Sequence, residues 1–301
     1  MSIEAVHVSV GYGKKVVLRD LTLSIKEGEV LGLAGLNGSG KTTTIKTLAG
    51  IISPHAGKVL VDGVDPADAK EFVSERIAWV QENPLFETDS SIFDLVKYFA
   101  TLRGIDRVDL ERTAHYVLLR VGLSGAERTK VTRLSMGMRK RLSIAVAMLG
   151  NPKYYLFDEM FNGLDPEGIK FMKDKISELR SSGHGILLSS HVLSELQSIA
   201  NRVVIIVNGE TTEPVTLAEL LSQGQSTIRL RVSNPDEKLL ERLKAYGTVS
   251  VRQDQINVSG VKQDPSAINA ELVNAGYMVT EFVSTDNILE EYFAQKTGAH
   301  E

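Results

Sequence analysis

A glycine-rich segment at residues 35–42 combines the residue types that hold nucleotide phosphates. It reads Gly-Leu-Asn-Gly-Ser-Gly-Lys-Thr and fits the pattern G-x-x-x-x-G-K-[ST]. Glycines let backbone N–H groups turn toward an anion, and the start of a helix adds positive partial charge. We expect Lys41 to reach the β- and γ-phosphates and Thr42 to place its hydroxyl on Mg²⁺. The predicted nucleotide-binding residues of this segment are Gly35, Leu36, Asn37, Gly38, Ser39, Gly40, Lys41, Thr42 and Thr43.

Two adjacent carboxylates, Asp158 and Glu159, follow four apolar residues at 154–157. In an open parallel sheet, ligands bind beyond the carboxyl ends of the strands, so this pair can meet the glycine-rich segment. We expect Asp158 to hold Mg²⁺, directly or through water, and Glu159 to orient or deprotonate an attacking water. The residues alone also allow a solvated acidic turn that caps a buried strand. The neighbouring phosphate loop favours the catalytic interpretation.

Short apolar runs alternate with helical patterns over the first two-thirds of the chain and must position these residues. The run at 30–34 enters the glycine-rich turn, and residues 41–49 read as a helix, which is the context that a phosphate loop requires. Further strands are expected at 58–63, 77–81, 154–157, 185–189 and 203–207. This pattern predicts an α/β fold with a mainly parallel sheet covered by helices. At about residues 85–135 the periodicity is helical, which indicates an inserted helical subdomain.

The end of the chain has a different pattern and predicts a second, smaller α+β domain. Alternating and helical segments follow one another in the order βαββαβ with a final helix, which is the split-βαβ or ferredoxin-like order. A small polar stretch at 222–225 separates the two parts, so we expect domains at 1–222 and 226–301. The second domain shows no catalytic cluster. It is interpreted either as a stabilising or dimerising appendage or as a regulatory domain.

The amino-acid composition of the chain limits the classes of partner that it is expected to bind. The chain has no cysteine, which excludes disulfides and thiolate metal sites. A net charge of −4 argues against binding to nucleic acid. The N-terminus has no signal-peptide pattern. No run of 18 apolar residues is present, so we expect any membrane span to come from another polypeptide.

Together these motifs resemble the nucleotide-binding subunit of an ATP-binding-cassette (ABC) transporter over about the first 210 residues. The resemblance implies a P-loop ABC ATPase domain that binds ATP and Mg²⁺. It also implies that Tyr12 stacks on adenine, that Gln81 senses Mg²⁺ and links the site to the helical subdomain, and that His191 contacts the γ-phosphate. Residues 162–165 match the D-loop of the family. The predicted catalytic residues are Lys41, Gln81, Glu159 and His191, and the predicted metal ligands are Thr42, Gln81 and Asp158.

The segment at 134–139 resembles the family signature, usually LSGGQ, with two departures. Met136 replaces the first glycine and Met138 replaces the glutamine, and methionine cannot donate a hydrogen bond. Ser135 and Gly137 remain, and they supply a hydroxyl and an approachable backbone N–H at a helix start. This variant of the signature and the tail at 287–293 resemble the exporter (ABC-2) type of the family.

The resemblance further implies partners. Two such subunits pair head to tail in the family, so Ser135 and Gly137 would act on ATP held by Lys41 of a second copy, most simply in a homodimer. A separate transmembrane permease would bind near Gln81 and the helical insertion, with the chain peripheral on the cytoplasmic face of the membrane. Phe86 either accepts a helix of that permease or packs in the core of the insertion.

Two other interpretations belong to different functional classes. A soluble ABC-type ATPase could act as a regulatory switch or on ribosomes or DNA, but such proteins usually carry two cassettes or a long coiled coil. The chain has one phosphate loop and no sustained heptads. A switch that binds ATP without hydrolysing it would not need Glu159 and His191, which are both present.

Overall fold

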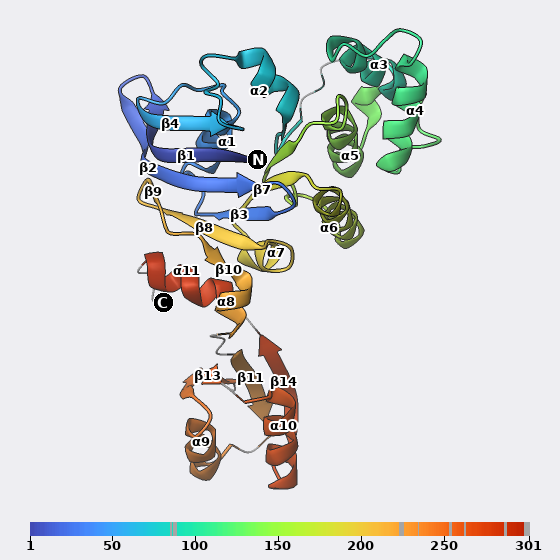
Figure 1. Ribbon diagram of the computed structural model, residues 1–301. Coiled ribbons are helices and arrows are strands. Elements are labelled where there is room, and N and C mark those ends of the chain that lie inside the picture. The colour runs from blue at the N-terminus through green and yellow to red at the C-terminus, as the bar shows by residue number, and fades with distance from the viewer. Residues whose placement is uncertain are drawn as a thin grey trace. The chain divides into compact units, whose positions relative to one another are not determined.

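A computed structural model describes residues 1–84, 86, 89–222, 226–233, 235–252, 255–261, 263–285 and 288–297. The chain divides into two compact units, Met1–Val215 and Thr216–Glu301, shown in Figure 1. The sequence suggested a boundary a few residues later, and its residues 223–225 lie outside the described part of the chain.

One large sheet organises the first unit. Its strand order is β4-β1-β2-β9-β8-β3-β7-β6-β5, and β10 pairs with β8. The strands are β1 (Ser2–Tyr12), β2 (Lys15–Lys26), β3 (Val30–Ala34), β4 (Ala56–Val61), β5 (Ile77–Val80), β6 (Tyr154–Asp158), β7 (Gly185–Ser190), β8 (Arg202–Val207), β9 (Glu210–Thr211) and β10 (Val215–Thr216). The five strands β8, β3, β7, β6 and β5 run parallel, whereas β1 pairs antiparallel with β2 and β4.

The parallel strands are buried on both faces, as their continuous apolar sequences predict. Every residue of β3, β6 and β7 is buried. Because these strands are parallel neighbours, their carboxyl ends meet at one edge of the sheet. The phosphate loop, the segment that begins with Gln81, the acidic pair and His191 all leave the sheet at that edge.

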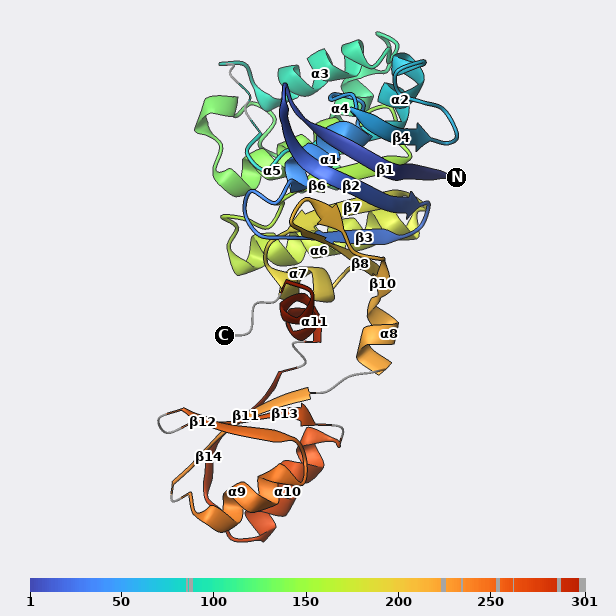
Figure 2. The ribbon, with the colours of Figure 1, turned by 90° about the vertical axis from the view of Figure 1, so that its left-hand side faces the viewer.

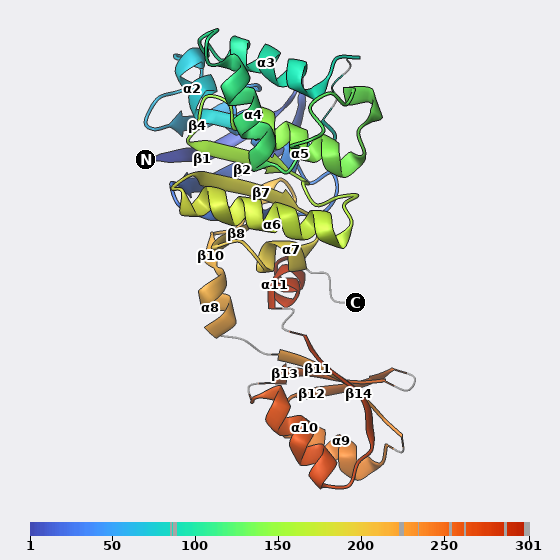
Figure 3. The same cartoon turned by 90° about the vertical axis from the view of Figure 1, so that its right-hand side faces the viewer.

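Helices cover this sheet and form the expected insertion. The helices of the unit are α1 (Lys41–Leu48), α2 (Lys70–Arg76), α3 (Ile92–Leu102), α4 (Leu110–Arg120), the 3-10 turn η1 (Val131–Arg133), α5 (Met136–Ala147), α6 (Pro166–Ser181) and α7 (Leu193–Gln197). Helices α3, α4 and α5 contact one another, and α5 and α6 lie on the same side of the parallel strands (Figures 1 and 3). Helix α5 therefore joins the insertion, although it begins just beyond the expected end of that segment.

Polar side chains fix where the helices of the insertion begin. Ser91 caps α3 by accepting a hydrogen bond from the N–H of Asp94, and Ser135 caps α5 by accepting one from the N–H of Met138. Asp165 caps α6 in the same way, with Pro166 at the first helical position. The family-signature segment thus ends as the first turn of a capped helix.

The second unit is an antiparallel sheet with two helices on one face, visible in Figure 2. Its elements are α8 (Leu217–Ser222), β11 (Ser226–Val232), α9 (Glu237–Lys244), β12 (Thr248–Arg252), β13 (Gln255–Val261), α10 (Pro265–Asn274), β14 (Val279–Thr285) and α11 (Ile288–Thr297). The strand order is β12-β13-β11-β14, and β13 separates β11 from β12. This is the predicted split-βαβ arrangement.

Apolar residues from both helices and the sheet form one core in the second unit. Leu239 of α9 and Leu272 of α10 pack with Ile228 and Leu230 of β11, while Arg229 on the same strand is exposed. The alternation of buried and exposed residues in β11 thus indicates a sheet that is covered on one face. Among the described residues of the whole chain, no helix has both the length and the apolar character that a membrane crossing requires.

Candidate nucleotide-binding site

The phosphate loop connects β3 to α1, and two of its glycines are required by close packing. A Cβ atom at Gly35 would lie 2.4 Å from Ser39 Oγ. Gly40 has a φ of 115°, and a Cβ there would lie 2.7 Å from the side chain of Leu18. The loop therefore turns tightly enough to direct backbone N–H groups toward an anion at the start of α1.

Lys41 is buried at the first turn of α1. Its Nζ donates hydrogen bonds to the carbonyl oxygens of Gly35 at 2.8 Å and Leu36 at 3.2 Å. The same ammonium lies 3.0 Å from Glu159 Oε1. This contact joins the glycine-rich segment to the acidic pair, as the shared edge of the sheet predicted.

The acidic pair at the end of β6 is held by Ser189 of β7. Ser189 Oγ donates to Asp158 Oδ1 at 2.8 Å, and the N–H of Glu159 donates to Ser189 Oγ at 3.1 Å. Burial raises the pKa of Asp158, and hydrogen bonds from Thr42 and Ser189 oppose that shift. Thr42 and Asp158, the two predicted metal ligands from different motifs, are therefore in contact.

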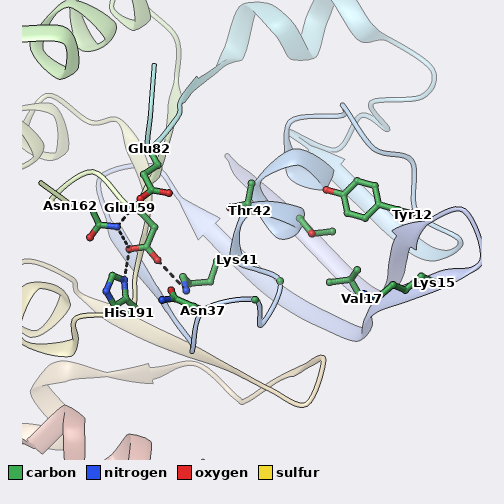
Figure 4. A pocket seen from close by; sticks show the side chains of 13 residues that line it. Tyr12, Lys15, Val17, Asn37, Lys41, Thr42, Glu82, Glu159, Asn162 and His191 are labelled. Carbon is green, nitrogen blue, oxygen red and sulfur yellow. Dashed lines mark hydrogen bonds and ion pairs between the residues drawn. The ribbon is translucent and has the colours of Figure 1, made fainter. Parts of the chain in front are cut away.

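Glu159 has both carboxylate oxygens engaged. Oε1 pairs with Lys41, and Oε2 lies 2.9 Å from Nδ1 of His191, which follows β7. The backbone of Glu159 adopts a left-handed φ of 48°, which costs a non-glycine residue about 1 kcal/mol or more. The contacts with Lys41 and His191 hold the carboxylate in its position. Figure 4 shows Glu159 between Lys41 and His191.

These groups border a cavity of about 550 Å³. Tyr12, Lys15 and Val17 lie at one end of it, and Glu82, Glu159, Asn162 and His191 lie at the other (Figure 4). The lining residues are Tyr12, Lys15, Val17, Asn37, Gly38, Gly40, Lys41, Thr42, Thr43, Glu82, Glu159, Asn162 and His191. Tyr12 is half exposed at the cavity mouth, so its ring is available to a planar ligand.

Gln81 is not among the residues that line this cavity. Its side chain is exposed and borders a second pocket, of about 450 Å³, together with Trp79, Pro84 and Phe86. Glu82 occupies the nucleotide cavity instead and accepts a hydrogen bond from Asn162 Nδ2 at 3.0 Å. Gln81 directly follows β5 and Glu82 lies at the bend after it, and their side chains line different pockets.

We expect this difference to appear in ATP hydrolysis by the isolated chain. Glu82→Ala should lower the rate by about tenfold or more, because it removes a carboxylate from the reacting end of the cavity. The matched variant Gln81→Ala should change the rate by less than about twofold, as surface substitutions usually do. Steady-state phosphate release measures both. A larger loss of rate for Gln81→Ala than for Glu82→Ala would show that Gln81, and not Glu82, contributes to hydrolysis.

Ser135 and Gly137 also lie outside this cavity. Both sit at the N-terminus of α5, where the side chain of Ser135 is exposed. A Cβ at Gly137 would lie 3.8 Å from Leu164, so the signature segment adjoins the loop that follows Glu159. Within one copy of the chain, the signature and Lys41 are therefore not brought together.

Two observations test whether ATP and Mg²⁺ fit this site. Ser39 Oγ is buried without a hydrogen-bond partner inside the phosphate loop, as a donor to a bound anion would be. No group of three or more His, Cys, Asp or Glu side chains within the described residues could hold a metal alone. Thr42 and Asp158 offer two oxygen donors, which suits Mg²⁺ because it completes its shell with phosphates and water. The residues fit both groups.

A parallel sheet with a phosphate loop, an acidic strand end and a strand-end histidine at one cavity defines a P-loop nucleoside triphosphatase. These three motifs come from distant parts of the sequence and converge there. Sequence reasoning missed Glu82, Lys15 and Val17, and it placed Asn162 in a motif without assigning its side chain. No pattern in the sequence pointed to Glu82, because it lies at a bend just after β5.

Comparisons with known proteins identify the family. The ABC transporter family profile matches residues 18–162. The chain is 34% identical over 292 residues to "Uncharacterized ABC transporter ATP-binding protein YdbJ" of Bacillus subtilis, covering 96% of this chain and 93% of that protein. It is 29% identical over 300 residues to "Bacitracin transport ATP-binding protein BcrA" of Enterococcus faecalis, covering 98% and 96%. The chain belongs to the ATP-binding proteins of ABC transporters.

A solved structure supports the same assignment. A protein described as "Structure of ATP binding subunit of ABC transporter" shares 31% sequence identity and a TM-score of 0.68, covering 74% of this chain and 93% of that one. The predicted α/β ATPase fold is confirmed. The chain is an ATP-binding and ATP-hydrolysing subunit of an ABC transporter, which the sequence favoured over a soluble switch.

Proposed function

We propose that the chain is the Mg²⁺-dependent motor of an exporter, acting as a homodimer with a separate permease on the cytoplasmic face of the membrane. The observation that carries the proposal is Glu159, held between Lys41 and His191 at the reacting end of the cavity. The name of the bacitracin transport relative, which matches nearly the whole chain, supports transport, and the exporter-like signature segment at 134–139 supports its direction. The permease, and not this chain, would select the cargo.

The residues divide the work of hydrolysis between binding and water activation. Backbone N–H groups of the loop and Lys41 hold the phosphates, and Tyr12 stacks on the base. Glu159 accepts the proton of the attacking water, while His191 keeps the carboxylate oriented through Nδ1. Thr42 and Asp158 would hold Mg²⁺, which neutralises charge on the β- and γ-phosphates when bound.

A second copy completes the site. Ser135 and Gly137 lie at a capped helix N-terminus whose first backbone N–H groups suit an anion. They do not line the cavity of their own copy, and the segment is exposed, so its ligand is ATP held by a partner. Head-to-tail pairing then builds two equivalent sites.

The second pocket is the proposed docking groove for the permease. It lies between β5 and helices α3 and α5, and its lining includes Gln81, Phe86 and Phe99. The rings of Phe86 and Phe99 meet edge to face with centroids 6.2 Å apart, so Phe86 contributes both to the packing of the insertion and to the wall of the groove. An apolar helix of the permease would fit such a surface.

Cross-linking tests this coupling, and the absence of native cysteine makes each introduced thiol unique. We expect Phe86→Cys, after treatment with a short bifunctional reagent, to yield a covalent adduct with the co-purified permease. Leu119→Cys is the matched control, because Leu119 is exposed on α4 of the same insertion and does not line the groove. Equal amounts of adduct from both positions, or no adduct from Phe86→Cys, would contradict the proposal that this groove binds the permease.

A further inference from the structure

Lys140 is a fully buried lysine in helix α5, with 0% of its surface exposed. Lysine is almost never fully buried unless its ammonium finds partners. Its Nζ donates to three backbone carbonyls, those of Asn162 at 2.6 Å, Met160 at 2.9 Å and Glu159 at 3.4 Å. All three acceptors belong to the loop that carries the hydrolytic glutamate.

The chemistry of this contact requires the charged form of the side chain. An ammonium has three N–H donors and no acceptor, which matches three carbonyl acceptors. Burial lowers the pKa of Lys140, and the carboxylates of Glu82, Glu195 and Glu159 oppose that shift. No carboxylate of the described residues lies within ion-pair distance of Nζ, so the carbonyls are its direct ligands.

Asn162 extends the contact into the nucleotide cavity. While its carbonyl oxygen accepts from Lys140, its Nδ2 donates to Glu82 Oε1 at 3.0 Å and lies 3.5 Å from Glu159 Oε2 (Figure 4). The loop between Glu159 and Asn162 is thus fixed by its backbone on one side and by two carboxylates on the other. Because Glu159 begins this loop and Lys140 holds its backbone carbonyl, a displacement of the loop would redirect the Glu159 side chain.

Helix α5 is also the helix that Ser135 caps, so Lys140 directly follows the signature segment and stands about one and a half turns beyond Ser135. We propose that Lys140 is a positioning residue that couples the signature helix to Glu159. Movement of α5 when a partner's nucleotide meets Ser135 is transmitted through Nζ to residues 159–162. This inference rests on the proposed role of Glu159 as the group that activates water.

The test compares Lys140→Met with Lys175→Met. Lys175 of α6 is 5% exposed and pairs with Glu178, so its replacement measures the cost of removing a buried ammonium away from the loop. Lys140→Met should lower the single-turnover rate about 10- to 100-fold without changing ATP affinity, because the catalytic group is displaced rather than lost. Lys175→Met should keep the rate within about threefold when measured on folded protein.

A double variant separates positioning from general stability. In the background of Glu159→Gln, Lys140→Met should reduce the residual rate by less than about threefold, since residues that act through one another are not additive. An equal fold-loss in both backgrounds, or a loss no larger than that of Lys175→Met, would overturn the inference. If Lys140→Met does not fold, Lys140→Gln, which keeps two N–H donors, replaces it with the same expectation. A wild-type rate for Glu159→Gln alone would instead refute the proposed function.

Discussion

Replacing Glu159 with glutamine is expected to lower ATP hydrolysis by a factor of about 10² to 10⁴, the range of general-base catalysis, while ATP still binds. An amide keeps the shape of the side chain and its oxygen can still face Lys41, at the position where Oε1 now lies 3.0 Å from Nζ. It cannot accept the proton of the attacking water. Phosphate release at saturating Mg²⁺ and ATP measures the rate, and a fluorescent nucleotide measures binding.

A control separates this effect from loss of a buried charge. Glu29 is also partly buried and pairs with Arg202 at 2.7 Å, but it lies outside the cavity. Glu29→Gln should therefore keep the hydrolysis rate within about threefold. If Glu159→Gln hydrolysed ATP as fast as the wild type, another group would have to activate the water. Chelation of Mg²⁺ in the same assay would then show whether the remaining activity uses this site.

The second large effect is expected at the signature. Ser135→Arg should reduce hydrolysis by about 100-fold or more, because it replaces the hydroxyl at this exposed helix start and covers the N–H groups that would meet the nucleotide of a second copy. ATP binding by each copy should change little, since Ser135 does not line its own cavity. Nucleotide affinity and turnover, measured on the same preparation, distinguish the two steps.

Ser91→Arg is the matched control for this variant. Ser91 caps α3 in the same insertion as Ser135 caps α5, so both changes remove one helix cap at a cost of about 1 kcal/mol. Turnover per folded Ser91→Arg protein should stay near the wild-type value. Comparable losses from both variants would mean that the insertion is merely destabilised and that the signature has no special role.

Local motifs with fixed spacing were the part of the site that could be predicted from the sequence. The loop around Lys41 and the pair that contains Glu159 each follow an apolar run, and parallel strands bring their ends together. His191 follows the same rule after β7. The βαββαβ order of the second unit was also readable, because alternating apolar residues mark strands that are covered on one face.

Side-chain direction and long-range backbone contacts could not be predicted in this way. Gln81 was predicted from its match to a glutamine of the family, and only the structure shows that the next residue, Glu82, lines the cavity. The left-handed φ of Glu159 could not be predicted, because glutamate rarely adopts this backbone conformation. Lys140 is bound by carbonyl oxygens about twenty residues away, and backbone acceptors leave no trace in the sequence.

Mixing two inactive variants tests most directly whether each site is shared between copies. Lys41→Ala removes the phosphate-binding lysine, and Ser135→Arg blocks the signature, so each variant alone should be nearly inactive. A mixed pair contains one intact site, built from Lys41 of one copy and Ser135 of the other. Random pairing of equal amounts should restore roughly a quarter of the wild-type hydrolysis rate if the two symmetric sites act independently. A mixture as inactive as its components, although mixed pairs form, would contradict a shared site.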